Sequence, residues 1–197
     1  MLARAFTLIE LLVVVAIIAI LAAIAIPNFL EAQTRAKVSR AKNDMKVVVT
    51  ALETYMIDNN RYPTYHYANV TDPALHFHLG GTVPSFAAPD PTWNGRNPIT
   101  TPIAYITAMP RDPFARQVGD AIETSEFLFV NWDYAIERTG IATFPALRAS
   151  YGPYRLHSRG PDLKGPDSGT PYDPTNGTVS RGDVTWGPNT GFDKLVL

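Results

Sequence analysis

A single carboxylate inside an apolar run is the first feature of this sequence that could do chemistry. Glu10 lies within the 21 residues from Phe6 to Ile26, in which Thr7 is the only other polar side chain. A carboxylate at the centre of a membrane helix costs about 2.5 to 3.5 kcal/mol, so it calls for a partner. One interpretation is an interfacial side chain that reaches headgroup water. The other is an ion pair, whose nearest cation would be an amino terminus created by cleavage before Phe6.

A second candidate site is the aspartate- and glycine-rich segment from Leu156 to Val184. Its 29 residues contain four aspartates, five glycines and four prolines. Structureless loops longer than about 12 to 15 residues are uncommon in compact domains unless something holds them. Calcium is a physical candidate, because it accepts carboxylate and carbonyl oxygens in flexible geometry. The spacing is not that of an EF-hand, and aspartate is common in turns, so composition alone leaves both interpretations open.

Composition excludes several kinds of chemistry. The chain has 197 residues, 17 basic and 18 acidic side chains and no cysteine. A disulfide scaffold, a thiolate zinc site and a cysteine nucleophile are therefore excluded, and the balanced charge does not suggest a nucleic-acid partner. The sequence has no P-loop, no G-x-S-x-G elbow and no H-E-x-x-H pair, and His76 and His78 lack an identifiable third metal ligand. We expect a protein that is not an enzyme.

The residues around Glu10 predict one long helix. The run from Phe6 to Ile26 is long enough to cross a bilayer, which takes about 20 apolar residues. No glycine and one proline occur from Phe6 to Asn60, so a helix over 6–60 would be about 80 Å long. Pro27 removes one backbone donor and predicts a kink or local unwinding over residues 23–27.

The second half of this helix is amphipathic. Apolar side chains recur at spacings of three and four, which predicts one buried stripe. Its members are Val38, Ala41, Met45, Val48, Leu52 and Tyr55. The stripe could form a short coiled coil, but we favour packing against the chain's own C-terminal domain. The basic residues between these positions are expected to form a solvated face, close to acidic lipid headgroups.

The remainder, residues 61–197, predicts a globular head of short strands and loops. All 13 glycines lie at or after Gly80, and this density of glycine and proline disfavours long helices. The best strand candidates are residues 127–134 and 149–158, and residues 63–100 resemble an insertion or a long loop. The predicted fold class is α+β, with the long N-terminal helix packed on a small antiparallel β-sheet that carries long loops.

The N-terminus resembles those of type IV pilins and type II secretion pseudopilins. These proteins have a short leader with a basic residue, cleavage before Phe, Glu at the fifth mature position and a later Pro. The segment from Ala5 to Val14 matches with Phe6 and Glu10, and Pro27 follows. Ala5 departs from the pattern, because the family usually has Gly as the last leader residue.

The resemblance implies a maturation and assembly route. Residues 1–5 would be a leader, and a prepilin peptidase would cut between Ala5 and Phe6 and methylate the new amine. The apolar helix would leave the membrane lipid and pack into a homopolymer filament, in which Glu10 would neutralise the amine of its own or a neighbouring subunit. Two charges that are too costly to bury singly are tolerable as a pair. The implied partners are the peptidase, minor pseudopilins and an inner-membrane assembly platform.

Two further segments carry the resemblance. Residues 105–114, with a Pro-Arg-Asp-Pro turn, are similar to the segment that precedes the sheet in the major pseudopilin. Residues 156–162 and 182–184 are similar to its calcium loop. The resemblance implies that carbonyls and carboxylates of this loop bind structural Ca²⁺. The candidate ligands are the carbonyls of Leu156 and Ser158 and the carboxylates of Asp162 and Asp183, with Asp173 as a further candidate.

These observations predict a pilin fold and a structural subunit of a type II secretion pseudopilus. The protein would be anchored once in the inner membrane with its head in the periplasm, before it joins a periplasmic or cell-surface filament. A type IV pilus pilin is the alternative within this class. A membrane-tethered extracytoplasmic binding module or hydrolase is the alternative from another class, but a tether has no need for Glu10.

Overall fold

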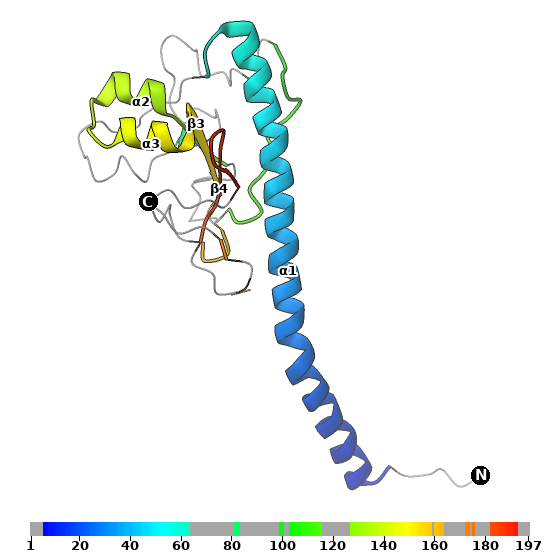
Figure 1. Cartoon of the computed structure of the whole chain (residues 1–197). Helices are drawn as coiled ribbons and strands as arrows, with labels where there is room; N and C mark the ends of the chain where they lie inside the picture. The colour runs from blue at the N-terminus through cyan, green and yellow to red at the C-terminus, as the bar shows by residue number, and fades with distance from the viewer. Residues whose placement is uncertain are drawn as a thin grey trace.

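The computed structural model consists of one long helix and a head packed beside its second half (Figure 1). It describes residues 6–63, 81–82, 99–100, 103–115, 127–158, 160–163, 172–173, 175 and 182–192. The order of elements is α1 (Leu8–Asn59), β1 (Gly81–Thr82), β2 (Leu128–Asn131), α2 (Trp132–Thr139), α3 (Phe144–Tyr151), β3 (Tyr154–Ser158), β4 (Val184–Gly187) and β5 (Gly191–Phe192). This α+β architecture confirms the predicted fold class.

Helix α1 matches its prediction closely at both ends. Thr7 is its N-cap, and its C-cap is Asn60, which adopts a left-handed conformation with φ of 53°. The helix is continuous through Pro27, so the predicted local unwinding is wrong. One missing donor leaves the hydrogen bonds of the neighbouring turns in place, and the axis instead changes direction gently over its blue part in Figure 1.

The head contains one antiparallel sheet whose strands lie side by side in chain order, from β1 to β5. The central strand β3 pairs with β2 through Phe129 and Leu156, and with β4 through Leu156 and Trp186. In Figure 1 the strands lie between α1 and the pair of helices α2 and α3.

The stripe of α1 is buried against the head. All six predicted members are buried, together with Ala51. They share one core cluster with Phe129, Tyr154, Leu156 and Val184 of the sheet. The stripe therefore packs on the chain's own C-terminal domain, as we favoured over a coiled coil.

Two predicted strands are too long. Residues 127–134 form a strand only as far as Asn131, whose side-chain oxygen then accepts a hydrogen bond from Tyr134 N at 3.1 Å and caps α2. Residues 149–158 begin as the end of α3, and β3 starts only at Tyr154. Gly152, with φ of 96°, ends α3 in a conformation that favours glycine. Capping and turn chemistry therefore override strand propensity at both places.

One carboxylate fixes how α1 sits on the sheet. Glu53 accepts hydrogen bonds from the hydroxyls of Tyr154 at 2.8 Å and Tyr62 at 3.0 Å. Burial, and then the Glu53 carboxylate, raise the pKa of both tyrosines, which keeps them protonated donors. The bond from Tyr154 therefore links α1 to the central strand β3, whereas Tyr62 follows α1 in the chain.

Candidate functional site

The first candidate site is the N-terminal end of α1, where Thr7 and Glu10 form a capping box. Thr7 N donates to Glu10 Oε2 at 2.9 Å, and Thr7 Oγ1 donates to the same oxygen at 2.7 Å. Glu10 N in turn donates to Thr7 Oγ1 at 3.3 Å. The carboxylate thus folds back onto Thr7, the residue that follows Phe6, the predicted new amino terminus. Ala5 lies outside the described residues.

The capping box was missed in the analysis of the sequence, although its signal was present there. A Thr followed three residues later by Glu, just before an apolar run, is the known signature of this motif. The box supplies partners for orphan backbone donors at the helix start. Glu10 therefore has a structural role within its own chain, besides any role between subunits.

Beyond the box, the apolar half of α1 exposes its large side chains to solvent. The large apolar side chains from Leu8 to Leu30 have exposed fractions of roughly one half to three quarters, for example 59% at Leu12 and 58% at Ile18. This part of the helix is long and apolar enough to cross a membrane. An apolar surface of this extent marks a site of contact with lipid or protein. Pro27 lies within this half, close to the point where charged residues begin.

The second candidate site is the base of the aspartate-rich loop. Gly160 has φ of 66°, and a Cβ atom there would lie 2.4 Å from the carbonyl oxygen of Gly182. Only glycine permits this approach, which brings the two ends of the loop together. Tyr172 N also donates to the carbonyl of Asp183 at 3.1 Å. The loop is therefore closed at its base by backbone contacts.

The predicted calcium ligands differ in how deeply they are buried. Leu156 and Ser158 are buried in β3, and the Asp183 side chain is 1% exposed. Asp162 is half-buried. Asp173 is exposed, and its carboxylate accepts hydrogen bonds from Oγ1 and N of Thr175, which lower its pKa. In the described part of the chain, no three His, Cys, Asp or Glu side chains group closely enough to hold a metal ion.

Two buried side chains at this base were not among the predicted site residues. His157 Nε2 lies 3.5 Å from the Asp183 carboxylate, and both side chains are almost fully buried. Asp112 accepts hydrogen bonds from the Ser158 hydroxyl at 2.8 Å and from Phe114 N at 2.9 Å. The Pro-Arg-Asp-Pro turn is thus fastened to β3. No sequence signal links positions so far apart in the chain.

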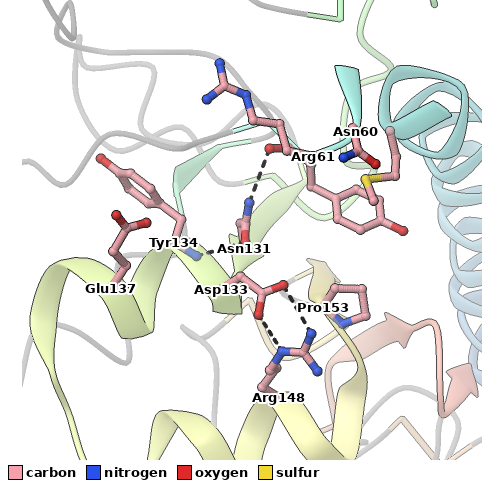
Figure 2. A pocket seen from close by; sticks show the side chains of 10 residues that line it. Asn60, Arg61, Asn131, Asp133, Tyr134, Glu137, Arg148 and Pro153 are labelled. Carbon is pink, nitrogen blue, oxygen red and sulfur yellow. Dashed lines mark hydrogen bonds and ion pairs between the residues drawn. The ribbon is translucent and has the colours of Figure 1, made fainter. Parts of the chain in front are cut away.

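A pocket of about 430 Å³ lies where the end of α1 meets α2 and α3 (Figure 2). Asn60 and Arg61, which directly follow α1, line it on one side, and Tyr134 and Glu137 of α2 line it on the other. Figure 2 also shows two hydrogen bonds from Arg148 of α3 to Asp133. This pairing raises the pKa of Arg148. The pocket could not be predicted, because its lining comes from segments that are distant in the sequence.

Comparison with known proteins finds two family models that match the N-terminal third of the chain. The family model described as the prokaryotic N-terminal methylation motif matches residues 1–26, and that of type II secretion system protein G matches residues 28–70. Over its first 70 residues the chain is therefore similar to type IV pilins and type II secretion pseudopilins. Membrane anchoring through the N-terminal apolar helix follows from this motif.

Relatives of this pilin-like protein include pilins and secretion components. The type IV major pilin protein PilA of Myxococcus xanthus is 38% identical over 120 residues, which is 61% of this chain and 54% of that protein. The type II secretion system core protein G of Pseudomonas aeruginosa is 48% identical over 59 residues, 30% of this chain and 42% of that protein. The chain thus spans about half the length of these two relatives.

A third relative is matched over most of its length. The type II secretion system core protein G of Escherichia coli is 29% identical over 179 residues, which is 90% of this chain and 93% of that protein. No solved structure matches the pilin-like chain. Its named relatives are filament and secretion components rather than enzymes, which agrees with the expected absence of an enzymatic activity.

Proposed function

We propose that the chain is the major structural subunit of a type II secretion pseudopilus. The observation that carries this proposal is the exposed apolar half of α1. This half begins with the capping box of Thr7 and Glu10, just after the predicted cleavage position. The match to protein G over 179 residues supports secretion as the setting. The same helix then serves first as a membrane anchor and later as the filament core.

In this proposal the apolar half of α1 is covered by lipid before assembly and by other subunits after it. In the bilayer, lipid covers it, and the proposed head faces the periplasm. In the filament, copies of the same helix cover it, and a repeated head-to-tail contact does not close, so it generates a fibre. Cleavage between Ala5 and Phe6 by a prepilin peptidase would create the amine that Glu10 meets. Minor pseudopilins and an inner-membrane platform are the proposed partners that start and drive growth.

A type IV pilus pilin is the second candidate function. The match to the Myxococcus xanthus major pilin favours it, since that match extends over 120 residues. Deletion of the gene in its native cell separates the two candidates. We expect extracellular proteins to accumulate inside the cell while surface pili persist. Loss of pili with normal secretion supports the pilus pilin. If secretion and pili are both unchanged, both candidate functions are refuted.

We further propose that structural Ca²⁺ is held at the base of the aspartate-rich loop. The carboxylates of Asp162 and Asp183 and the carbonyls of Leu156 and Ser158 are the candidate ligands, and oxygen donors suit this ion. The support is the close approach of Gly160 and Gly182, which brings the two ends of the loop together. Asp173 is engaged with Thr175 instead. The ion would stiffen the loop and take no part in a reaction.

Calcium chelation tests this second proposal. We expect a chelator to lower the melting temperature of the full chain in detergent, and we expect Asp183→Asn to remove that response. Asp173→Asn is the matched control and should keep it. A wild-type melting temperature that ignores both chelator and added calcium would show that backbone contacts alone hold the loop.

A further inference from the structure

Arg155 of β3 is held between two aromatic rings. Its guanidinium carbon lies 5.8 Å from the centroid of the Trp132 ring and 5.1 Å from that of the Tyr151 ring. Trp132 begins α2 and Tyr151 ends α3, and both side chains are almost fully buried. A guanidinium stacks favourably on aromatic rings, so this aromatic clamp of Trp132 and Tyr151 restricts where the charge can lie.

The turn between β4 and β5 holds Tyr151 in place. Asn189 N donates to the carbonyl of Tyr151 at 3.1 Å, and Asn189 Nδ2 donates to the carbonyl of Ala149 at the same distance. A Cβ atom at Gly187 would lie 2.6 Å from the carbonyl oxygen of Tyr151, so glycine permits β4 to approach this closely. The aromatic clamp is therefore a built part of the head.

Arg155 has no carboxylate partner in the described part of the chain. Its Nε atom is buried and donates no hydrogen bond. The side chain as a whole is half-buried, and its two terminal nitrogens are not among the buried atoms that lack a partner. Nη1 and Nη2 therefore remain as an accessible pair of donors.

Arg148 of α3 shows what a guanidinium of this head binds when a carboxylate is within reach. It donates from Nε and Nη2 to the two oxygens of Asp133, although both side chains are about half exposed. Arg155 is less exposed and lacks such an acceptor. A charge that is partly withdrawn from water without a counter-charge is unfavourable, which favours a partner from outside this head.

The surface beside Arg155 is apolar. Val130 of β2 is the cross-strand partner of Arg155 and is half-buried. Cross-strand partners lie on the same face of a sheet, and the next residue, Leu156, belongs to the core that α1 shares. Arg155 and Val130 therefore lie on the face that is turned away from α1.

We propose that Arg155 is a binding site for an aliphatic carboxylate, whose oxygens accept from Nη1 and Nη2 while its carbon chain lies on Val130. Such a pair of parallel, charge-assisted hydrogen bonds is the geometry that a guanidinium favours. The aromatic clamp holds a single positive charge, so a singly charged carboxylate balances it better than a doubly charged phosphate. Two sources share this chemistry, a free small carboxylate and a glutamate side chain of a second copy of this chain.

Titration of the full chain in detergent with sodium butyrate tests the site. In protein labelled with ¹⁵N-arginine, we expect the Nε–H resonance of Arg155 to shift saturably at constant ionic strength. Butyrate should bind more tightly than acetate, because its carbon chain reaches Val130. The Nε–H resonance of Arg148, which is already bonded to Asp133, is the internal control and should not move. An equal shift with sodium chloride, no saturation, or tighter binding of inorganic phosphate would each overturn the proposal.

Substitution of Arg155 provides an independent measurement. Arg155→Lys keeps the charge but lacks the planar pair of donors, so we expect about a tenfold loss of butyrate affinity. The indole N–H of Trp132, which stacks on Arg155, reports binding in this variant. Arg148→Lys is the matched control and should bind butyrate as the wild-type chain does. Wild-type affinity in a folded Arg155→Lys contradicts the site, and the wild-type titration decides alone if that variant does not fold.

Phenylglyoxal, which modifies accessible guanidinium groups, separates the two sources. Modification of Arg155 is measured by mass spectrometry in the isolated chain, with and without butyrate, and in sheared filaments. Protection in filaments assigns the carboxylate to a second copy, and protection by butyrate alone assigns a free small carboxylate. Equal modification in all three samples would overturn the proposal. Only the filament sample rests on the proposed function, so absence of filaments counts against that function and leaves the titration valid.

Discussion

The two halves of α1 share one continuous backbone and face opposite environments. From Leu8 to Leu30 the large apolar side chains are exposed on every side of the helix, whereas from Val38 to Tyr55 one stripe is covered by the head. Leu12 is 59% exposed and Leu52 is fully buried. The difference shows that one half completes the fold of the chain, while the other half needs lipid or further copies.

The largest effect should come from the carboxylate that begins the exposed half. We expect Glu10→Ala to abolish filament assembly, because an N-terminal amine would then be buried without its counter-charge. The melting temperature of the head should stay unchanged. Electron microscopy of sheared filaments measures assembly, and circular dichroism in detergent measures the head. Normal filaments in Glu10→Ala would contradict the pairing.

Truncation of one leucine in each half tests the comparison itself. Leu52→Ala should destabilise the head by about 2 to 5 kcal/mol, because it leaves a cavity in a packed core. Leu12→Ala removes the same atoms from an exposed position and should leave the unfolding of the head unchanged while it weakens assembly. Denaturant unfolding of the full chain in detergent provides the free energies. Equal losses of stability would contradict the division of α1 into two halves.

Removal of one donor from the Glu53 bridge should have a smaller effect. Tyr154→Phe is expected to cost about 1 to 3 kcal/mol, since the half-buried Glu53 carboxylate loses a charge-assisted hydrogen bond. The pKa of Tyr154 is raised in the folded chain, so above pH about 10 the unfolded chain releases a proton that the folded chain keeps. Stability should therefore fall as pH rises above that value.

Unfolding curves measured between pH 7 and 11 check this sign. Tyr62→Phe should reduce the alkaline loss of stability in the same direction, because the pKa of Tyr62 is also raised. The free energy of unfolding should fall less steeply with pH in Tyr154→Phe than in the wild-type chain, because the variant lacks the hydroxyl proton of Tyr154. An equally steep loss would assign the alkaline effect to other tyrosines.

The smallest effect is expected at the surface pair beside the pocket. Arg148→Gln removes two hydrogen bonds to Asp133, but both side chains are about half exposed, so the cost should be at most about 1 kcal/mol. The free energy of unfolding in low and high salt measures it. A cost of several kcal/mol would mean that the pocket is part of the core of the head and not a surface feature.

Much of α1 was predictable because its signals are local. Twenty-one nearly uninterrupted apolar residues, and then apolar residues at spacings of three and four, predict both halves and the six buried positions. The family resemblance was also local, since Phe6, Glu10 and Pro27 stand at fixed separations. The capping box of Thr7 and Glu10 was equally local, and could have been predicted from the T-x-x-E pattern.

For the head, the sequence predicted only the class of structure and not the bounds of its elements. Glycine and proline density indicated short strands and loops, but Asn131 as a helix cap and Gly152 as a helix end shortened two predicted strands. Residues 63–100 lie almost entirely outside the described residues, so the predicted insertion stays a prediction. The proposed calcium ligands also stay a prediction, although the approach of Gly160 and Gly182 places the two loop ends together.

The sequence by itself determined the helix, its two halves and the position of one carboxylate within the apolar run, because periodicity and spacing act along a single chain. Only the tertiary structure decided that Glu53 links α1 to Tyr154 and that Arg61 lines one pocket with Glu137 and Arg148. These contacts join positions about 75 to 100 residues apart, and their partners are selected by packing rather than by any local preference.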